Sequence, residues 1–76
     1  MPRSAWVDIR DADGKLLVSI PARIQGGTVS ADLPAFPPNT HGTIQLCTDE
    51  DGTTYRDEPD LEELPTKPLL LVVQTG

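Results

Sequence analysis

The chain has 76 residues, of which 37% are hydrophobic and 24% charged, and its 12 acidic against 6 basic residues give a net charge of −6. A chain of this length forms one domain, here residues 1–76, and buries only about 60% of its unfolded surface, so its core is small. The only cysteine, Cys47, leaves no partner for an intrachain disulfide, and the soft ligands are too few for a structural zinc site.

Two strands joined by a tight turn are predicted at the start of the chain. Residues 5–10 alternate apolar and polar side chains, and residues 15–20 place Leu16, Val18 and Ile20 on one face, as a strand with one buried face does. The connection at 11–14 reads Asp-Ala-Asp-Gly. Asp favours such a turn because its side chain bonds nearby backbone, and Gly accepts a positive φ. These residues therefore predict a β-hairpin.

Further strands are predicted at 28–33, 43–47 and 53–56, with a stiff proline-rich loop at 34–42 between the first two. A second Asp-x-Asp-Gly turn at 49–52 predicts a second hairpin. In both copies a proline follows the turn at the same distance. The chain is therefore either a duplicated hairpin-plus-strand unit or one that uses common turn chemistry twice.

The C-terminal part predicts a short helical turn and a final strand. Pro59 suits the first helical position, acidic residues suit the N-terminal end of a helix and Pro65 stops it, so one helical turn is expected near 59–64. Residues 69–74 form the last strand. Together these patterns predict an all-β fold, a small antiparallel barrel or sandwich of about six short strands.

The final strand is apolar on both faces, because residues 69–73 form a continuous apolar run and a strand shows its side chains alternately. A two-layer domain covers one of these faces. The other is covered either by segment 59–64 or by another chain, through packing or edge pairing. Trp6, on the polar side of its strand, is either a further contact or an ordinary half-covered residue. The candidate partner-binding residues are Trp6, Leu69, Leu70, Leu71, Val72 and Val73.

Negative charge is concentrated in the last third of the chain. Basic and acidic residues cancel over 1–48, so residues 49–76 carry the whole net charge of −6. Such an acidic face either keeps a small protein in solution or attracts a basic partner, and it repels nucleic acid and anionic membranes. Its members are Asp49, Glu50, Asp51, Asp57, Glu58, Asp60, Glu62 and Glu63.

The other polar motifs predict no catalytic, metal or cofactor site. Neither Asp-x-Asp-Gly turn fits a calcium loop, because the glycine and the closing acid do not stand at the required spacing. No nucleophile motif accompanies His41, which is expected in a surface loop, and Cys47 is expected to pack as a small hydrophobe. Residues 34–37 have P-x-x-P spacing without a flanking arginine, so a pinned loop is favoured over a recognition motif.

These features predict a non-catalytic structural or protein-interaction module, for example an accessory component of a virion or another particle. Its partner is a protein or a second copy, and no cofactor, nucleic acid or membrane is expected. The alternative is an acidic inhibitor of a basic nucleic-acid-binding protein. No apolar run reaches membrane-spanning length and no signal peptide is evident, so the expected location is the cytoplasm or an assembled particle.

Overall fold

The computed structural model describes residues 4–50, 53–56 and 58–74, apart from the side chains of Glu50, Thr53 and Tyr55. The described residues form eight strands and no helix, and every strand pairing is antiparallel, which confirms the all-β prediction. In chain order the strands are β1 (Ser4–Asp11), β2 (Leu16–Pro21), β3 (Arg23–Gln25), β4 (Thr28–Leu33), β5 (His41–Glu50), β6 (Thr53–Arg56), β7 (Glu62–Glu63) and β8 (Leu69–Gln74).

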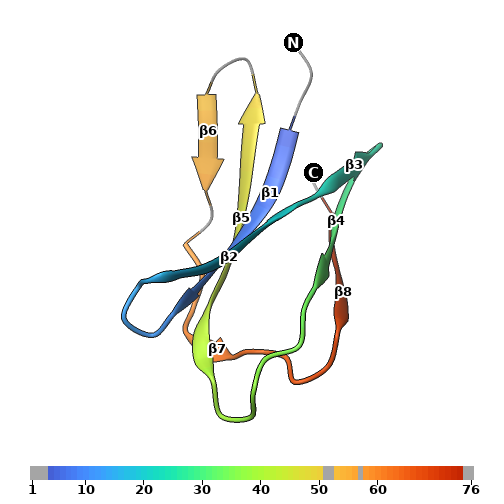
Figure 1. The fold of residues 1–76 in the computed structure, drawn as a ribbon. Helices are drawn as coiled ribbons and strands as arrows, with labels where there is room; N and C mark the ends of the chain where they lie inside the picture. Colours follow the sequence, from blue (N-terminus) through green and yellow to red (C-terminus); the bar gives the residue numbers. More distant parts are fainter. Residues whose placement is uncertain (1–3, 51–52, 57, 75–76) are drawn as a thin grey trace.

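The strands make two sheets, which Figure 1 shows on either side of the interior. One sheet has the order β2-β1-β5-β6, with β7 also paired to β5, and the other has the order β3-β4-β8. Only Ala22 separates β2 from β3, so this one segment joins the sheets along one side; its amide donates to the carbonyl of Ala5 at 3.0 Å. On the opposite side β8 pairs only with β4 within the described chain, so the sheets do not close into a barrel.

Alternating side chains on the facing sides of the two sheets build the core. Val7 and Ile9 of β1 and Ala31 and Leu33 of β4 are buried, as the period-2 pattern predicts. Leu64 completes this cluster from the segment before β8. Partly buried residues pack around it: Val18, Ile20, Ala22, Phe36, Ile44, Leu46 and Leu71.

The helical turn predicted near 59–64 is wrong. These residues run extended, and β7 pairs with His41 and Gly42 of β5. The amide of Leu64 donates to the carbonyl of Thr40 at 2.8 Å, while the Leu64 side chain is 1% exposed. The edge of β5 thus satisfies backbone groups that a single helical turn leaves unpaired, and an isolated turn is costly to nucleate.

The six predicted strands are present, and the structure adds β3 and β7. These two have three and two residues, too short for any alternation to mark them in the sequence. The largest difference in bounds is at β5, which has ten residues and begins at His41. His41 was expected in a loop; it is instead the first residue of a strand because β7 pairs with it there.

The first Asp-x-Asp-Gly motif forms the turn between β1 and β2. Oδ1 of Asp11 accepts hydrogen bonds from the amides of Asp13 and Lys15, both at 2.9 Å. Gly14 follows with a φ of 86°, a conformation that glycine adopts without steric cost. The predicted hairpin is confirmed, and its turn chemistry accounts for the motif.

The second copy of the motif lies in the hairpin of β5 and β6, where residues 51–52 are outside the described residues. The offset of 38 residues from Asp11 to Asp49 would superpose Val7 on Gln45. Val7 faces the core, whereas Gln45 lies opposite Asp8 on the outer face. At this offset the two copies do not superpose, so the repeated motif is not support for a duplication, and common turn chemistry is enough to explain it.

Candidate interaction surface

Strand β8 lies at the open side of its sheet. It pairs with β4 without interruption from Leu69, opposite Leu33, to Gln74, opposite Thr28. No other strand of the described chain pairs with β8. Figure 1 shows it at the outer side of β4, away from β5 and β6. Its second row of backbone N–H and C=O groups therefore has no strand partner within the described residues.

Successive side chains of β8 differ in exposure. Leu71 and Val73 point toward the core and are half-buried, whereas Leu70 and Val72 are 55% and 52% exposed on the outer face. Leu69 is 48% exposed at the start of the strand. Segment 59–64, which the sequence offered as a cover for this strand, pairs with β5 instead. We define the β8 surface as the free edge of β8 together with Leu69, Leu70 and Val72.

The charged residues of β3 and β4, the other strands of this sheet, form an ion pair with each other. Arg23 of β3 and Asp32 of β4 lie on the same outer face, and Nη1 of Arg23 is 3.0 Å from Oδ2 of Asp32. Strand β8 itself contains no charged residue. An apolar contact at this strand therefore buries no charge of its own.

Trp6, the other candidate contact, does not belong to the β8 surface. It is half-buried on the outer face of the opposite sheet, where it pairs with Pro21 on one side and Cys47 on the other. No Cα atom of β1 lies within 8 Å of a Cα atom of β8. The two parts of the predicted contact set therefore lie on separate surfaces.

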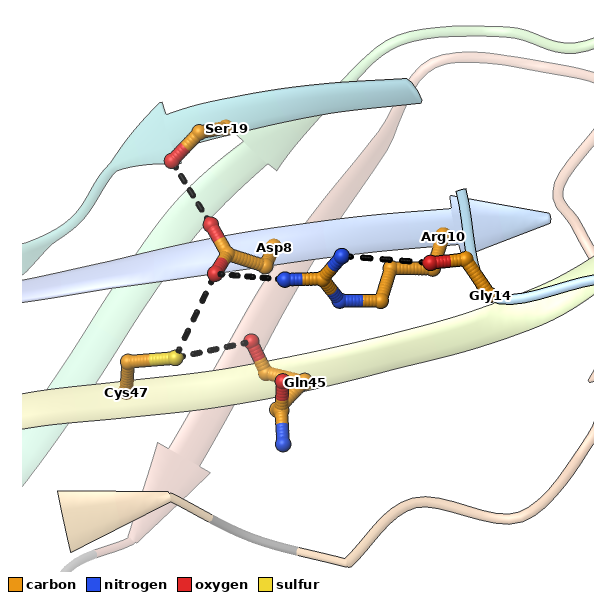
Figure 2. A network of polar contacts seen from close by, with 6 residues as sticks. All are labelled: Asp8, Arg10, Gly14, Ser19, Gln45 and Cys47. Atoms are coloured by element: carbon orange, nitrogen blue, oxygen red, sulfur yellow. Dashed lines mark hydrogen bonds and ion pairs between the residues drawn. The ribbon is translucent and has the colours of Figure 1, made fainter. Parts of the chain in front are cut away.

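The outer face around Trp6 holds a buried polar cluster that the alternation pattern did not reveal (Figure 2). Asp8 is only 6% exposed there, and its Oδ1 accepts a hydrogen bond of 2.7 Å from the hydroxyl of Ser19. Its Oδ2 lies 3.7 Å from the thiol of Cys47 and 4.0 Å from Nη2 of Arg10. Nη1 of Arg10 also donates to the carbonyl of Gly14 at 3.2 Å. The cluster ties β2, β1 and β5 together.

The contacts of this polar cluster stabilise the sheet. Cys47 is fully buried, so its thiol is closed to solvent, and both carboxylate oxygens of Asp8 have partners. Cys47 is buried as expected, and its thiol lies beside the carboxylate of Asp8. Nowhere in the described parts of the chain do three His, Cys, Asp or Glu side chains gather as for a metal ion, and no pocket opens on the described surface.

The acidic face is only partly described. Asp49 is half-buried, and its Oδ1 accepts a hydrogen bond of 3.2 Å from the hydroxyl of Thr54. The side chains of Glu50, Asp51 and Asp57 lie outside the described residues. The other four acids are exposed around β7, on the sheet opposite β8: Glu58, Asp60, Glu62 and Glu63. Their sheet also carries His41, which is exposed and pairs with Glu63.

The proline-rich loop is held to the domain as predicted. Phe36 is half-buried against the core, and its amide donates to the carbonyl of Pro65 at 2.8 Å. The hydroxyl of Thr40 donates to the carbonyl of Pro37 at 2.8 Å within the same loop. These contacts pin the loop that carries the P-x-x-P spacing.

Comparison with protein-family models, curated proteins and solved structures finds no match to this chain. In the part of the chain that the structure describes, there is no helix of membrane-spanning length and hydropathy. Among the chain's own surfaces, the β8 surface combines a free strand edge with exposed apolar side chains.

Proposed function

We propose that this protein is a non-catalytic protein-interaction module and that it joins a larger assembly through the β8 surface. The observation that carries the proposal is the exposure of Leu70 and Val72 on an uncharged edge strand. An edge strand offers a row of backbone donors and acceptors, and strand addition uses that row for affinity and the adjoining side chains for specificity. Strand β8 presents both at one place.

The size of the apolar contact sets how strong such binding is. Full burial of a Leu or Val side chain contributes about 1.5–3 kcal/mol, so covering the exposed halves of Leu69, Leu70 and Val72 contributes roughly 1 kcal/mol each. This contribution is too small for a tight complex by itself. A small accessory component of a virion or other particle is a suitable setting, because many copies acting together add avidity.

The proposal is tested by placing a photo-crosslinking amino acid at Leu70 in the full chain, produced in its source cells. The same substitution at Leu61 is the matched control, because Leu61 is 60% exposed but lies outside β8. We expect a covalent adduct with a protein from position 70 and none from position 61. If positions 69, 70 and 72 all give no protein adduct, the proposed function is wrong.

A second candidate, an acidic inhibitor of a basic nucleic-acid-binding protein, is supported by the exposed carboxylates of Glu58, Asp60, Glu62 and Glu63. Leu61 lies among these acids, so the same experiment separates the two functions. When the crosslinking is carried out in a lysate of these cells, an adduct that forms from position 61 at low salt but not in about 0.5 M salt, where charges are screened beyond about 4 Å, would favour the inhibitor. An adduct from position 70 that still forms at that salt concentration would favour the β8 surface.

A further inference from the structure

We infer that the partner of β8 is a second copy of this chain, paired antiparallel with it about a two-fold axis at Leu71. The inference rests on the proposed function and names the occupant of the β8 surface. Two β3-β4-β8 sheets would then become one continuous sheet, with the two β8 strands at its centre.

The first support is that β8 lacks the features that protect the protein's other edge strands from pairing with another chain. Its six residues contain no proline and no charge, and its register with β4 is unbroken. By contrast, β2 contains a register shift and ends in Pro21, β3 is three residues long with Arg23, β6 is four residues long and ends in Arg56, and β7 consists of two glutamates. Short strands, charges, bulges and prolines are the usual means of preventing edge pairing, so β8 is the edge open to another strand.

The second support is that β8 is complementary to itself. Antiparallel pairing must place outward side chains opposite outward ones, since a slip of one residue exchanges the two faces. With Leu71 on the two-fold axis, Leu70 of each copy lies opposite Val72 of the other on the outer face. On the inner face Leu69 lies opposite Val73. Every apolar side chain of the strand then meets an apolar side chain, which an axis at Val72 would not achieve because it would place Leu70 opposite Gln74.

The third support is charge. A copy of the same chain carries the same net charge of −6, so the two copies repel unless their acids are kept apart. The exposed acids of the described chain around β7 lie on the other sheet, and the nearest outward acid to β8, Asp32, is paired with Arg23. The dimer interface therefore brings together two uncharged β8 strands.

The size of the contact predicts a weak dimer. A stable interface buries about 800 Å² on each partner, and one strand edge with three half-exposed side chains covers less than that. We therefore expect a dissociation constant of about 10 μM to 1 mM. Raising the salt concentration screens the repulsion between the acidic copies, so it should leave the dimer intact or strengthen it.

Sedimentation equilibrium of the full chain, over a concentration series that reaches about 1 mM, measures this association. The variant Leu70→Lys places a lysine opposite Val72 at both symmetry-related positions of the dimer interface. We expect it to raise the dissociation constant at least about tenfold. The control Leu61→Lys makes the same change of charge at an exposed leucine and should leave the constant unchanged. Val72→Thr, which keeps the branched shape of a strand residue, should weaken the dimer in the same direction.

Amide hydrogen exchange, measured by NMR at low and high protein concentration, then locates the dimer interface. We expect amides of β8 to become protected as the concentration rises, while those of β2 do not change. Protection of β2 together with β8, accompanied by species larger than a dimer, would indicate head-to-tail association and overturn the inference. A monomer at about 1 mM with unprotected β8 amides would overturn it as well. In that case a crosslink from position 70 to a different protein would leave the proposed function standing, whereas no adduct would remove both.

Discussion

The hydroxyl of Ser19 donates a hydrogen bond of 2.7 Å to Oδ1 of Asp8, joining β2 to β1 on the outer face of their sheet. Asp8 is 6% exposed, and no buried side-chain polar atom of the described residues lacks a partner. A satisfied carboxylate in this position stabilises the sheet, whereas the same site with one partner removed is left with an unpaired polar group.

Replacing Asp8 with alanine should therefore destabilise the domain. The change removes the acceptor for the Ser19 hydroxyl and the Cys47 thiol, and we expect the free energy of unfolding to fall by about 1–3 kcal/mol. Urea denaturation followed by tryptophan fluorescence measures this loss. Asp32→Ala is the matched control, because the Asp32 side chain is 75% exposed and its ion pair with Arg23 contributes at most about 1 kcal/mol. Equal effects at the two positions would contradict the stabilising role of the buried cluster.

Replacing Leu64 with alanine should cost about 2–5 kcal/mol, because this fully buried side chain fills the core from the segment that was expected to be helical. The same substitution at Leu61, three residues earlier and 60% exposed, should change stability by less than about 0.5 kcal/mol. Thermal and urea unfolding of the two variants give the comparison. Similar losses would mean that segment 59–64 does not dock as described.

Gly42 is a position where even one additional methyl group is expected to be harmful. A Cβ atom there would overlap the backbone carbonyl oxygen of Arg10 on the neighbouring strand, which cannot move aside without breaking the β1–β5 pairing. We expect Gly42→Ala to destabilise the domain by about 2 kcal/mol or more in urea unfolding. As a control, Gly26→Asn should change stability by less than about 1 kcal/mol, since the site is open and asparagine tolerates its φ of 61°. A neutral effect at Gly42 would show that β1 and β5 are less closely paired there.

The Cys47 thiol should be protected from modification in the folded protein. It is 0% exposed, so a thiol reagent should reach it only when the sheet opens, at a rate at least about 10³-fold below that in denaturant. The reaction with a chromogenic disulfide reagent, followed over a urea series, provides the measurement. A cysteine introduced at the exposed position of Leu61 should react rapidly in the same folded chain. Rapid modification of Cys47 in water would reveal local opening between β1 and β5.

Much of the fold could be predicted because strand signals are local. The bounds of β4, β6 and β8 agree with the prediction, and the turn residues at 11–14 mark the first hairpin. The helical turn near 59–64 failed for the opposite reason. Its proline and acidic residues are genuine local signals, but the open edge of β5 and the core site for Leu64 are distant in the sequence. Tertiary hydrogen bonds and burial outweigh weak local preferences.

The features of the candidate site likewise divide into those set by local sequence and those set by the tertiary structure. By itself the sequence determined an all-β class, the two hairpins, and that residues 69–73 are apolar on both faces of a strand, because composition and alternation act within a few residues. Only the tertiary structure decided that β8 is an edge strand, that Leu70 and Val72 remain exposed, and that Asp8 is buried on an outward face. Those outcomes depend on which strands become neighbours, and that choice is made by burial summed over the whole chain.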